Sequence, residues 1–395
     1  MTKNNLSKGL SMSIIVGQAV RGENFWERVY ELEDIWSAIE SGSHILISAP
    51  RRVGKTSILY RIVDKPLENY IPLYIDTESA DSQNEFWEKL FHALMSEEFM
   101  SKLQLLTKTY WDKLKKIKFK KISTSGVEFG DGEVVDYKEA FKRVVEDLDD
   151  DKKIIIMIDE FAQTIENIIK YEDTQNALSL LKSHRELRQD SKIAQKISFI
   201  YAGSIGLESV VAKLGATKHI NDLNNIKVSP LTTQEAKAFT QKLASSNNIE
   251  IAEEEIAYLL KKVEWLIPFY IQLIVQEVKR ISRREPSITE ETIDKAISNS
   301  LEYRNYFENW QSKLKEAFEN KEYLFAKEVL NKISSEETLT SRKIANIATK
   351  HQLDDSREVL KALIYDGYIN NNDDPKIYRF NSPILRMWWY KNVAN

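Results

Sequence analysis

Ala49-Pro50-Arg51-Arg52-Val53-Gly54-Lys55-Thr56 is the stretch of sequence that decides the fold. An apolar run, His44–Ser48, comes before it, and a helical pattern begins at Ser57. Strand, loop and helix therefore follow one another, with a lysine and a hydroxyl residue directly after the last glycine. This is the spacing of a phosphate-binding loop, GxxxxGK(S/T).

The residue types in this loop predict how phosphates would be held. Backbone N–H groups of such a loop point inward at an anion, and the helix after it adds the positive end of its dipole. Gly54 leaves room for the backbone beside a phosphate, Lys55 reaches the outer phosphates, and the Thr56 hydroxyl ligates Mg²⁺. Ala49 replaces the first glycine, so the loop must open with backbone angles that suit a Cβ. We expect ATP or ADP with Mg²⁺ to bind along Pro50, Arg51, Arg52, Val53, Gly54, Lys55, Thr56 and Ser57.

A second motif ends another apolar run. Ile154–Ile158 is followed by Asp159-Glu160, the form of a Walker B element. Asp159 would hold Mg²⁺ directly or through water, and Glu160 would orient and polarise an attacking water. An acidic turn after a buried strand is common in itself. Behind a phosphate-binding loop, however, the pair indicates nucleotide binding, while rapid hydrolysis stays open.

Composition bounds the class of protein. A chain of 395 residues predicts two or three domains, and 56 Lys and Arg against 60 Asp and Glu give no overall attraction to nucleic acid or anionic lipid. The absence of cysteine excludes disulfides, thiol catalysis and cysteine-ligated zinc, and fits a reducing cytosol. With no signal-peptide pattern and no apolar stretch near ~20 residues, we expect a cytoplasmic protein without a membrane partner.

Strand and helix patterns alternate over the first domain, residues 1–232. Strands are expected at 44–48, 71–76, 154–158 and 197–202, which predicts an α/β fold with a parallel sheet covered by helices and ligands at the carboxyl ends of its strands. A basic hairpin near 113–135, turning at Gly130-Asp131-Gly132, interrupts the alternation. Its lysines fit either a solvated strand edge protected from aggregation or a contact for nucleic acid or an acidic partner.

Two further domains are predicted. Residues 233–318 form a helical lid, with Thr233 as a helix cap and helices at 234–244, 252–263, 268–283 and 289–301 leading to a connecting helix at 303–317. Residues 319–395 form a winged helix-turn-helix of three helices, at 323–333, 342–350 and 356–365, and a hairpin. The third helix is as acidic as it is basic, which favours protein contact or regulation over sequence-specific DNA binding.

With these parts in order, residues 15–395 resemble the STAND/AAA+ group of P-loop ATPases, close to prokaryotic ATPases related to the origin-recognition initiators. Residues 50–57 resemble the PRRVGKTS loop that recurs there. Phe25–Arg28 resembles an F-x-G-R box, with Glu27 in place of glycine, which implies that Arg28 helps to shape the base pocket. Gly203-Ser204 resembles the sensor-one position, which implies that Ser204 faces the γ-phosphate. Residues 378–385 and Trp388-Trp389 resemble the winged-helix ending.

The resemblance also has departures. Trp265–Phe269 keeps the proline of the lid motif G-x-P and lacks its glycine, so Pro268 is the implied nucleotide contact. Ring-forming members use an arginine finger from a neighbouring subunit, and Arg188, like Arg185, lies on the helix where one is expected. Weak surface ion pairs with Glu186 or Asp190 are an equally open interpretation. The resemblance therefore favours a nucleotide switch over a processive motor.

Three functions remain open from the sequence. The leading hypothesis is a switch driven by the binding and hydrolysis of ATP, in which Lys55, Glu160 and Ser204 sense the γ-phosphate. Its output would be the binding of a protein partner or self-assembly, and the family analogy points to signalling or defence. The alternative is a DNA-binding initiator or loader that uses the winged helix and the basic hairpin, with a steep salt dependence. The third is an adaptor whose nucleotide is a permanent structural ligand.

Overall fold

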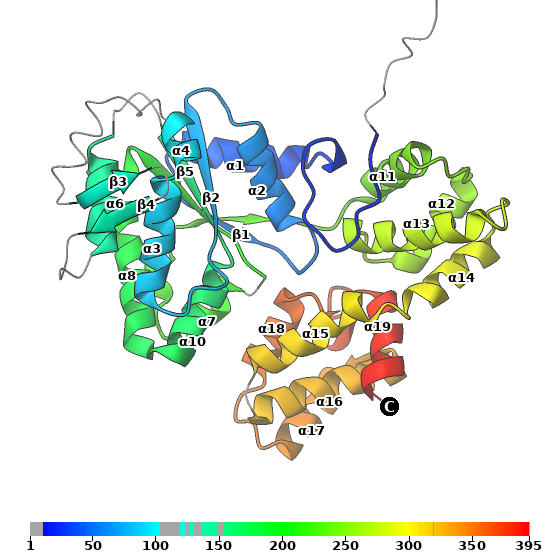
Figure 1. The fold of residues 1–395 in the computed structure, drawn as a ribbon. Coiled ribbons are helices and arrows are strands. Elements are labelled where there is room, and N and C mark those ends of the chain that lie inside the picture. The colour runs from blue at the N-terminus through cyan, green and yellow to red at the C-terminus, as the bar shows by residue number, and fades with distance from the viewer. Residues whose placement is uncertain are drawn as a thin grey trace, which may run out of the picture. The chain divides into compact units, whose positions relative to one another are not determined.

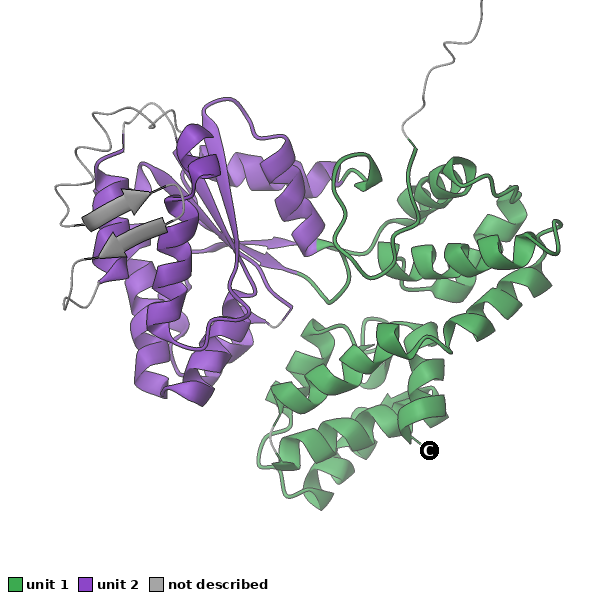
Figure 2. Cartoon of the chain, viewed as in Figure 1, with its two compact units in different colours: residues 1–27, 49–54, 229–395 green, residues 28–48, 55–228 purple. Residues whose placement is uncertain are grey.

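The computed structural model describes residues 11–102, 119–123, 126–129, 136–148, 153–204, 206–318 and 320–394. The chain divides into two compact units (Figure 2). Residues 28–48 and 55–228 make one, here called the core unit. Residues 1–27, 49–54 and 229–395 make the other, here called the helical unit. The predicted lid and C-terminal domain thus fall into one unit, together with the loop that precedes Lys55.

The core unit is built on a five-stranded sheet in the order β2-β5-β6-β1-β7 (Figure 1). Every neighbouring pair is parallel, which confirms the predicted α/β class. Because all strands run the same way, their carboxyl ends share one edge of the sheet. The strands are β1 (Ile45–Ser48), β2 (Tyr70–Asp76), β5 (Lys153–Asp159), β6 (Ile197–Tyr201) and β7 (Asn224–Lys227).

Strand β7 was not expected from the sequence, which predicts only four strands. Its four residues pair along β1, but Ile226 alone is buried. An edge strand contacts one neighbour and can keep polar side chains on both faces, so it lacks the apolar run that marks the other strands.

Helices flank the sheet of the core unit, with α1 and α2 on one side and α3, α6, α7 and α8 on the other (Figure 1). Side-chain caps begin several of them: Ser82 accepts from the Glu85 N–H at the start of α3, and Asp173 accepts from the Asn176 N–H at the start of α8. The helices are α1 (Val29–Glu40), α2 (Lys55–Asp64), α3 (Gln83–Leu94), α4 (Glu97–Lys102), α6 (Tyr137–Glu146), α7 (Phe161–Tyr171), α8 (Thr174–Gln189), α9 (Ser191–Ala194), α10 (Leu207–Lys213) and the 3₁₀ turn η2 (Thr217–His219).

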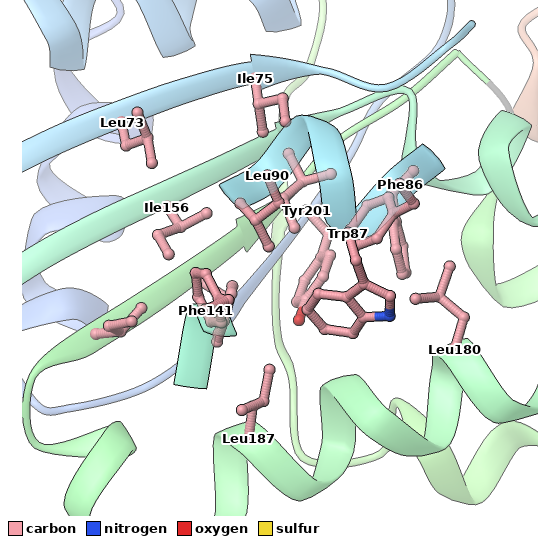
Figure 3. Packing of buried hydrophobic residues seen from close by; sticks show 14 of the residues in the cluster. Leu73, Ile75, Phe86, Trp87, Leu90, Phe141, Ile156, Leu180, Leu187 and Tyr201 are labelled. Atoms are coloured by element: carbon pink, nitrogen blue, oxygen red, sulfur yellow. The ribbon is translucent and has the colours of Figure 1, made fainter. Parts of the chain in front are cut away.

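Alternation along β5 explains why both faces of the sheet are covered. Ile154, Ile156 and Ile158 belong to the large hydrophobic cluster formed with the helices on one side (Figure 3). Ile155 and Met157 are also buried but lie outside that cluster. Successive side chains of a strand point to opposite faces, so these two residues pack on the other side.

The predicted hairpin segment contains two strands, β3 (Phe119–Ser123) and β4 (Gly126–Phe129), which pair antiparallel. In this pairing Ser123 lies opposite Gly126. The turn predicted at 130–132, like the basic residues 113–118, lies outside the described residues and stays a prediction.

The helical unit holds two groups of helices and a small sheet of order β8-β10-β9. Thr232, rather than Thr233, caps α11 in a capping box with Glu235. No helix in the described ranges is both long and apolar enough to cross a membrane. The elements are η1 (Gly22–Asn24), α11 (Thr233–Ser246), α12 (Glu253–Val263), α13 (Pro268–Ser282), α14 (Glu290–Ser300), α15 (Arg304–Ala317), α16 (Asn320–Glu336), β8 (Thr338–Thr340), α17 (Ser341–Lys350), α18 (Arg357–Tyr365), β9 (Ile369–Asn370), β10 (Ile377–Phe380), α19 (Pro383–Trp389) and the π-helical turn η3 (Tyr390–Ala394).

The cluster under the sheet makes a stability prediction. Leu90 on α3 is fully buried in it, whereas Leu67 is 39% exposed. Leu90→Ala leaves a cavity and should lower the free energy of unfolding by about 2–5 kcal/mol. Leu67→Ala is the matched control and should cost less than about 1 kcal/mol. Urea unfolding of the two variants measures the difference, and equal costs would contradict this packing.

Candidate functional site

The phosphate-binding motif occupies the turn between β1 and α2. Arg52 and Gly54 have left-handed backbone angles, with φ of 65° and 110°. Ala49 does not, so the alanine in place of the usual first glycine meets no backbone strain. Residues 49–54 of the motif belong to the helical unit. The rest of the motif, from Lys55 at the first position of α2, belongs to the core unit. Lys55 is buried there, with 8% of its surface exposed.

Within the core unit, the second half of this motif meets the acidic motif of β5. The Thr56 hydroxyl donates to Asp159 Oδ2 at 2.8 Å, and the two residues are 103 positions apart in the sequence. Asp159 is the last residue of β5 and is 3% exposed. The two residues that the sequence suggests as magnesium ligands are therefore in direct contact, a buried carboxylate beside a hydroxyl at the start of a helix.

Burial, reinforced by the charge of the neighbouring Glu160, raises the pKa of the Asp159 carboxyl to about 6. The hydrogen bond from Thr56 and the positive charge of Lys55 lower that pKa but do not cancel the effect of burial. The charged carboxylate is therefore held at a cost in this environment, which a bound cation would offset.

Glu160 stands at the N-terminal end of α7 with a left-handed backbone, φ 58°. Its Oε2 accepts from the backbone N–H of Ser204 at 2.8 Å and from the Ser204 hydroxyl at 3.0 Å. These two bonds link the residue directly after β5 to Ser204, which lies three residues beyond the end of the neighbouring strand β6. The predicted water-orienting carboxylate and the predicted sensor-one side chain are thus in direct contact.

Two polar residues at this edge of the sheet were missed by the sequence analysis. The Tyr74 hydroxyl donates to Asp159 Oδ2 at 3.3 Å, and Asp76 ends β2 in register with Asp159. Burial and the nearby Asp159 charge raise the pKa of Tyr74, so its proton is retained for donation. The available signal was that both strands end in aspartate, but only the strand order makes those ends neighbours.

Arg28 and Pro268 lie in different units. Arg28 immediately precedes α1 in the core unit, is 4% exposed and pairs with Glu31 at 3.2 Å. Pro268 is the first residue of α13 in the helical unit, where proline is favoured because that position needs no N–H donor.

Arg188 is buried inside the core unit. Its guanidinium makes two hydrogen bonds to Asp222, at 2.8 and 2.9 Å, and another to the Tyr201 hydroxyl at 3.1 Å. Its Nη2 also donates to the His219 carbonyl. The sequence leaves two interpretations of Arg188 open, an arginine finger and weak pairs with Glu186 or Asp190. The observed partner is instead Asp222, and these bonds occupy the guanidinium within its own chain.

The chain resembles known proteins over most of its length. Residues 25–264 match the family described as "ATPase domain predominantly from Archaea". Among solved structures, a Walker-type ATPase of Pyrococcus abyssi superposes with a TM-score of 0.67 at 15% identity, over 95% of this chain and 99% of that one. The ORC2 protein of Aeropyrum pernix, in ADPNP–ADP complexes, gives 0.57 at 13% identity, over 94% and 96%. These two likenesses establish a shared fold. A comparison with curated protein sequences finds no match.

The raised pKa of Asp159 predicts that a neutral residue at this position stabilises the fold by an amount that depends on pH. In the metal-free protein the charged carboxylate is disfavoured by burial, so Asp159→Asn should raise the free energy of unfolding at pH 8 by at most about 3 kcal/mol. The Thr56 and Tyr74 hydroxyls can rotate to suit an amide. The folded-state pKa of Asp159 is about 6, against an ordinary value of 3.8. As the pH falls from 6 toward 4, Asp159 becomes protonated in the folded wild type and its destabilising charge is lost. The difference in free energy of unfolding between variant and wild type should therefore shrink over this range.

Thermal or urea unfolding of both proteins across this pH range, in a chelating buffer, measures the difference. A variant that is less stable than wild type at every pH would mean that Asp159 is a net stabilising group and not a strained one.

Proposed function

The chain belongs to the family of ATPase domains found predominantly in Archaea, and from that premise we propose that it is an AAA+/STAND-type switch. It binds ATP, hydrolyses it slowly or on stimulation by a partner, and couples its nucleotide state to a protein partner or to self-assembly. Family membership supports the binding of ATP by an ATPase. The switch function is our proposal.

The observation that carries the proposal is the contact between Thr56 and Asp159. Two motifs separated by 103 positions meet through one hydrogen bond, and both side chains offer oxygen, the ligand type that Mg²⁺ prefers. No group of three or more acidic or histidine side chains suited to a metal occurs among the described residues. Thr56 and Asp159 would therefore hold Mg²⁺ together with phosphate oxygens of the nucleotide, where the ion neutralises phosphate charge.

The remaining motif residues supply positioning and charge. Backbone N–H groups of residues 51–54 would surround the phosphates, and the Lys55 ammonium would reach the outer ones. Glu160 would accept a hydrogen bond from the attacking water and so aim it at the γ-phosphorus. No side-chain nucleophile is needed, because the reaction depends on alignment and on stabilising negative charge.

The pair of Glu160 and Ser204 supports a sensing function. Glu160 accepts two hydrogen bonds from Ser204, so a γ-phosphate that engages the Ser204 donors would free the Glu160 carboxylate to align water. ATP and ADP would then favour different side-chain arrangements, which a switch requires, since equal affinity for two states shifts nothing. Arg28 is our candidate for a contact to the nucleotide base, and Pro268 is our candidate for the nucleotide contact made by the lid.

We propose a protein partner rather than DNA for the winged helix-turn-helix of residues 319–395. Its basic side chains are largely engaged by acidic ones, which leaves little positive charge for phosphates. On and beside α18, Arg357 pairs with Asp355 and Lys361 with Glu358. The other pairs are Lys343–Glu336, Lys350–Glu328, Arg379–Asp373, Arg386–Glu337 and Lys391–Glu302.

Loss of the lysine charge tests nucleotide binding. Lys55→Ala should raise the dissociation constant for ATP or ADP by roughly ten- to a hundredfold, because a charge-assisted contact to phosphate disappears. Lys65→Ala, an exposed lysine one residue beyond α2, is the control and should bind as wild type. Calorimetry with MgADP measures both, and unchanged affinity in Lys55→Ala would refute the site.

Neutralising the proposed water-orienting group tests hydrolysis. Glu160→Gln should keep ATP affinity within a few fold and lower kcat about a hundredfold or more. Glu172→Gln, at the exposed C-terminal end of α7, should leave kcat unchanged. Phosphate release under saturating MgATP gives both values, and undiminished turnover in Glu160→Gln would remove Glu160 from catalysis.

A further inference from the structure

The loop residues Pro50 and Arg52 make side-chain contacts within the helical unit, to which residues 49–54 belong (Figure 2). Next to these contacts are aromatic rings from three parts of that unit: the segment 265–270 that leads into α13, helix α15 and the turn before β9. We call this set the aromatic cluster; it consists of Trp265, Phe269, Tyr270, Tyr306, Trp310 and Tyr368.

The rings of the aromatic cluster contact one another in a chain. Phe269 lies 5.0 Å from Tyr270 and 6.1 Å from Tyr306, measured between ring centroids. Trp310 lies 4.9 Å from Tyr368, almost perpendicular to it, and the Tyr368 hydroxyl donates to the Trp310 carbonyl at 2.6 Å. The cluster therefore connects the lid helices to the C-terminal module through buried, directional contacts.

Arg52 joins the loop to this cluster. Its guanidinium carbon lies 4.2 Å from the centroid of the Phe269 ring, within the range of a cation–π interaction. A Cβ added at Gly17 would lie 3.5 Å from Arg52 Nη1 and 3.4 Å from Tyr306, so the N-terminal segment closes over the same arginine. The Arg52 side chain is thus held between the Phe269 ring and the N-terminal segment at Gly17.

Arg52 makes this contact with Phe269 from an unfavourable backbone conformation. At φ 65° it adopts the left-handed conformation, which disfavours a side chain with a Cβ and which glycine adopts without strain. Such strain persists only where surrounding contacts stabilise it, and it concentrates at functional positions. The Phe269 contact is the observed compensation.

Pro50 meets the C-terminal module at Gly367, whose φ is +86°. A Cβ added at Gly367 would lie 2.6 Å from Trp265 and 2.9 Å from Pro50, so only glycine permits this approach. Arg51 is 6% exposed, and its Nε and Nη2 atoms lack a hydrogen-bond partner within the part of the chain that the structure describes.

We propose that Arg52 is a positioning residue: together with the Pro50 contact, it fixes the phosphate-binding loop in its curled form by docking it on the aromatic cluster, and so couples nucleotide affinity to the packing of the C-terminal module. The proposal assigns the Arg52 side chain to Phe269, while the Arg52 backbone N–H stays a proposed donor to phosphate. Preorganising a loop in its binding conformation removes an ordering cost from the binding step. By reciprocity, a bound nucleotide then stabilises the docked cluster by the same free energy.

The inference rests on the proposed nucleotide site and is tested by MgADP affinity of the full chain. Arg52→Gly keeps the left-handed conformation available but removes the side chain, and Gly367→Ala disturbs the docking from the far end of the sequence. Each should raise the dissociation constant, by roughly five- to thirtyfold for the arginine. Phe269→Leu should match Arg52→Gly, whereas Phe269→Tyr, which keeps the ring, should restore affinity.

Three controls separate docking from a general loss of structure. Arg357→Ala removes an exposed arginine that pairs with Asp355 in the same unit and should bind as wild type. Combining Arg52→Gly with Phe269→Leu should weaken binding no more than either alone, since both remove one interaction. The tryptophan emission of wild type should change on adding MgADP, and Trp265→Phe should diminish that change.

Wild-type affinity in both Arg52→Gly and Gly367→Ala would overturn the inference while leaving the nucleotide site intact. Additive losses in the double variant would also overturn it, because the two side chains would then act separately. Absence of binding in the wild type itself would instead refute the proposed function.

Discussion

The hydrogen bond between Thr56 and Asp159 is the interaction on which the candidate site depends. It brings the start of α2 against the end of β5 at the carboxyl edge of the sheet, at 2.8 Å. Burial makes the Asp159 charge costly and raises its pKa, so the fold keeps a carboxylate where the unliganded protein would be better served by a neutral group. Such a cost is characteristic of sites whose stability comes from a ligand.

Two residues with left-handed backbones flank this interaction in the sequence. Arg52 precedes it in the loop, and Glu160 directly follows Asp159. Neither residue type favours that conformation, and each is held by a long-range contact: Arg52 by the Phe269 ring and Glu160 by Ser204. In our account both contacts change with the nucleotide, Ser204 by competing for the γ-phosphate and the aromatic cluster by gaining stability when the loop is occupied.

The sequence predicted the parts of the fold that local patterns encode. Strand β5 is apolar on both faces because helices cover both, and its acidic end was recognisable without a structure. Strand β7 was missed because an edge position needs only one buried residue, Ile226. Contacts between distant segments could not be predicted, since no local pattern marks Asp222 as the partner of Arg188, or Tyr74 as a neighbour of Asp159.

The most direct measurement is a crystal structure of the full chain with Mg²⁺ and a non-hydrolysable ATP analogue. The account predicts that the phosphates lie against the backbone amides of residues 51–56, with the metal bound through Thr56 and Asp159 and the Arg52 side chain turned away from the phosphates. Nucleotide bound elsewhere, or a loop that stays empty at saturating concentration, would contradict it.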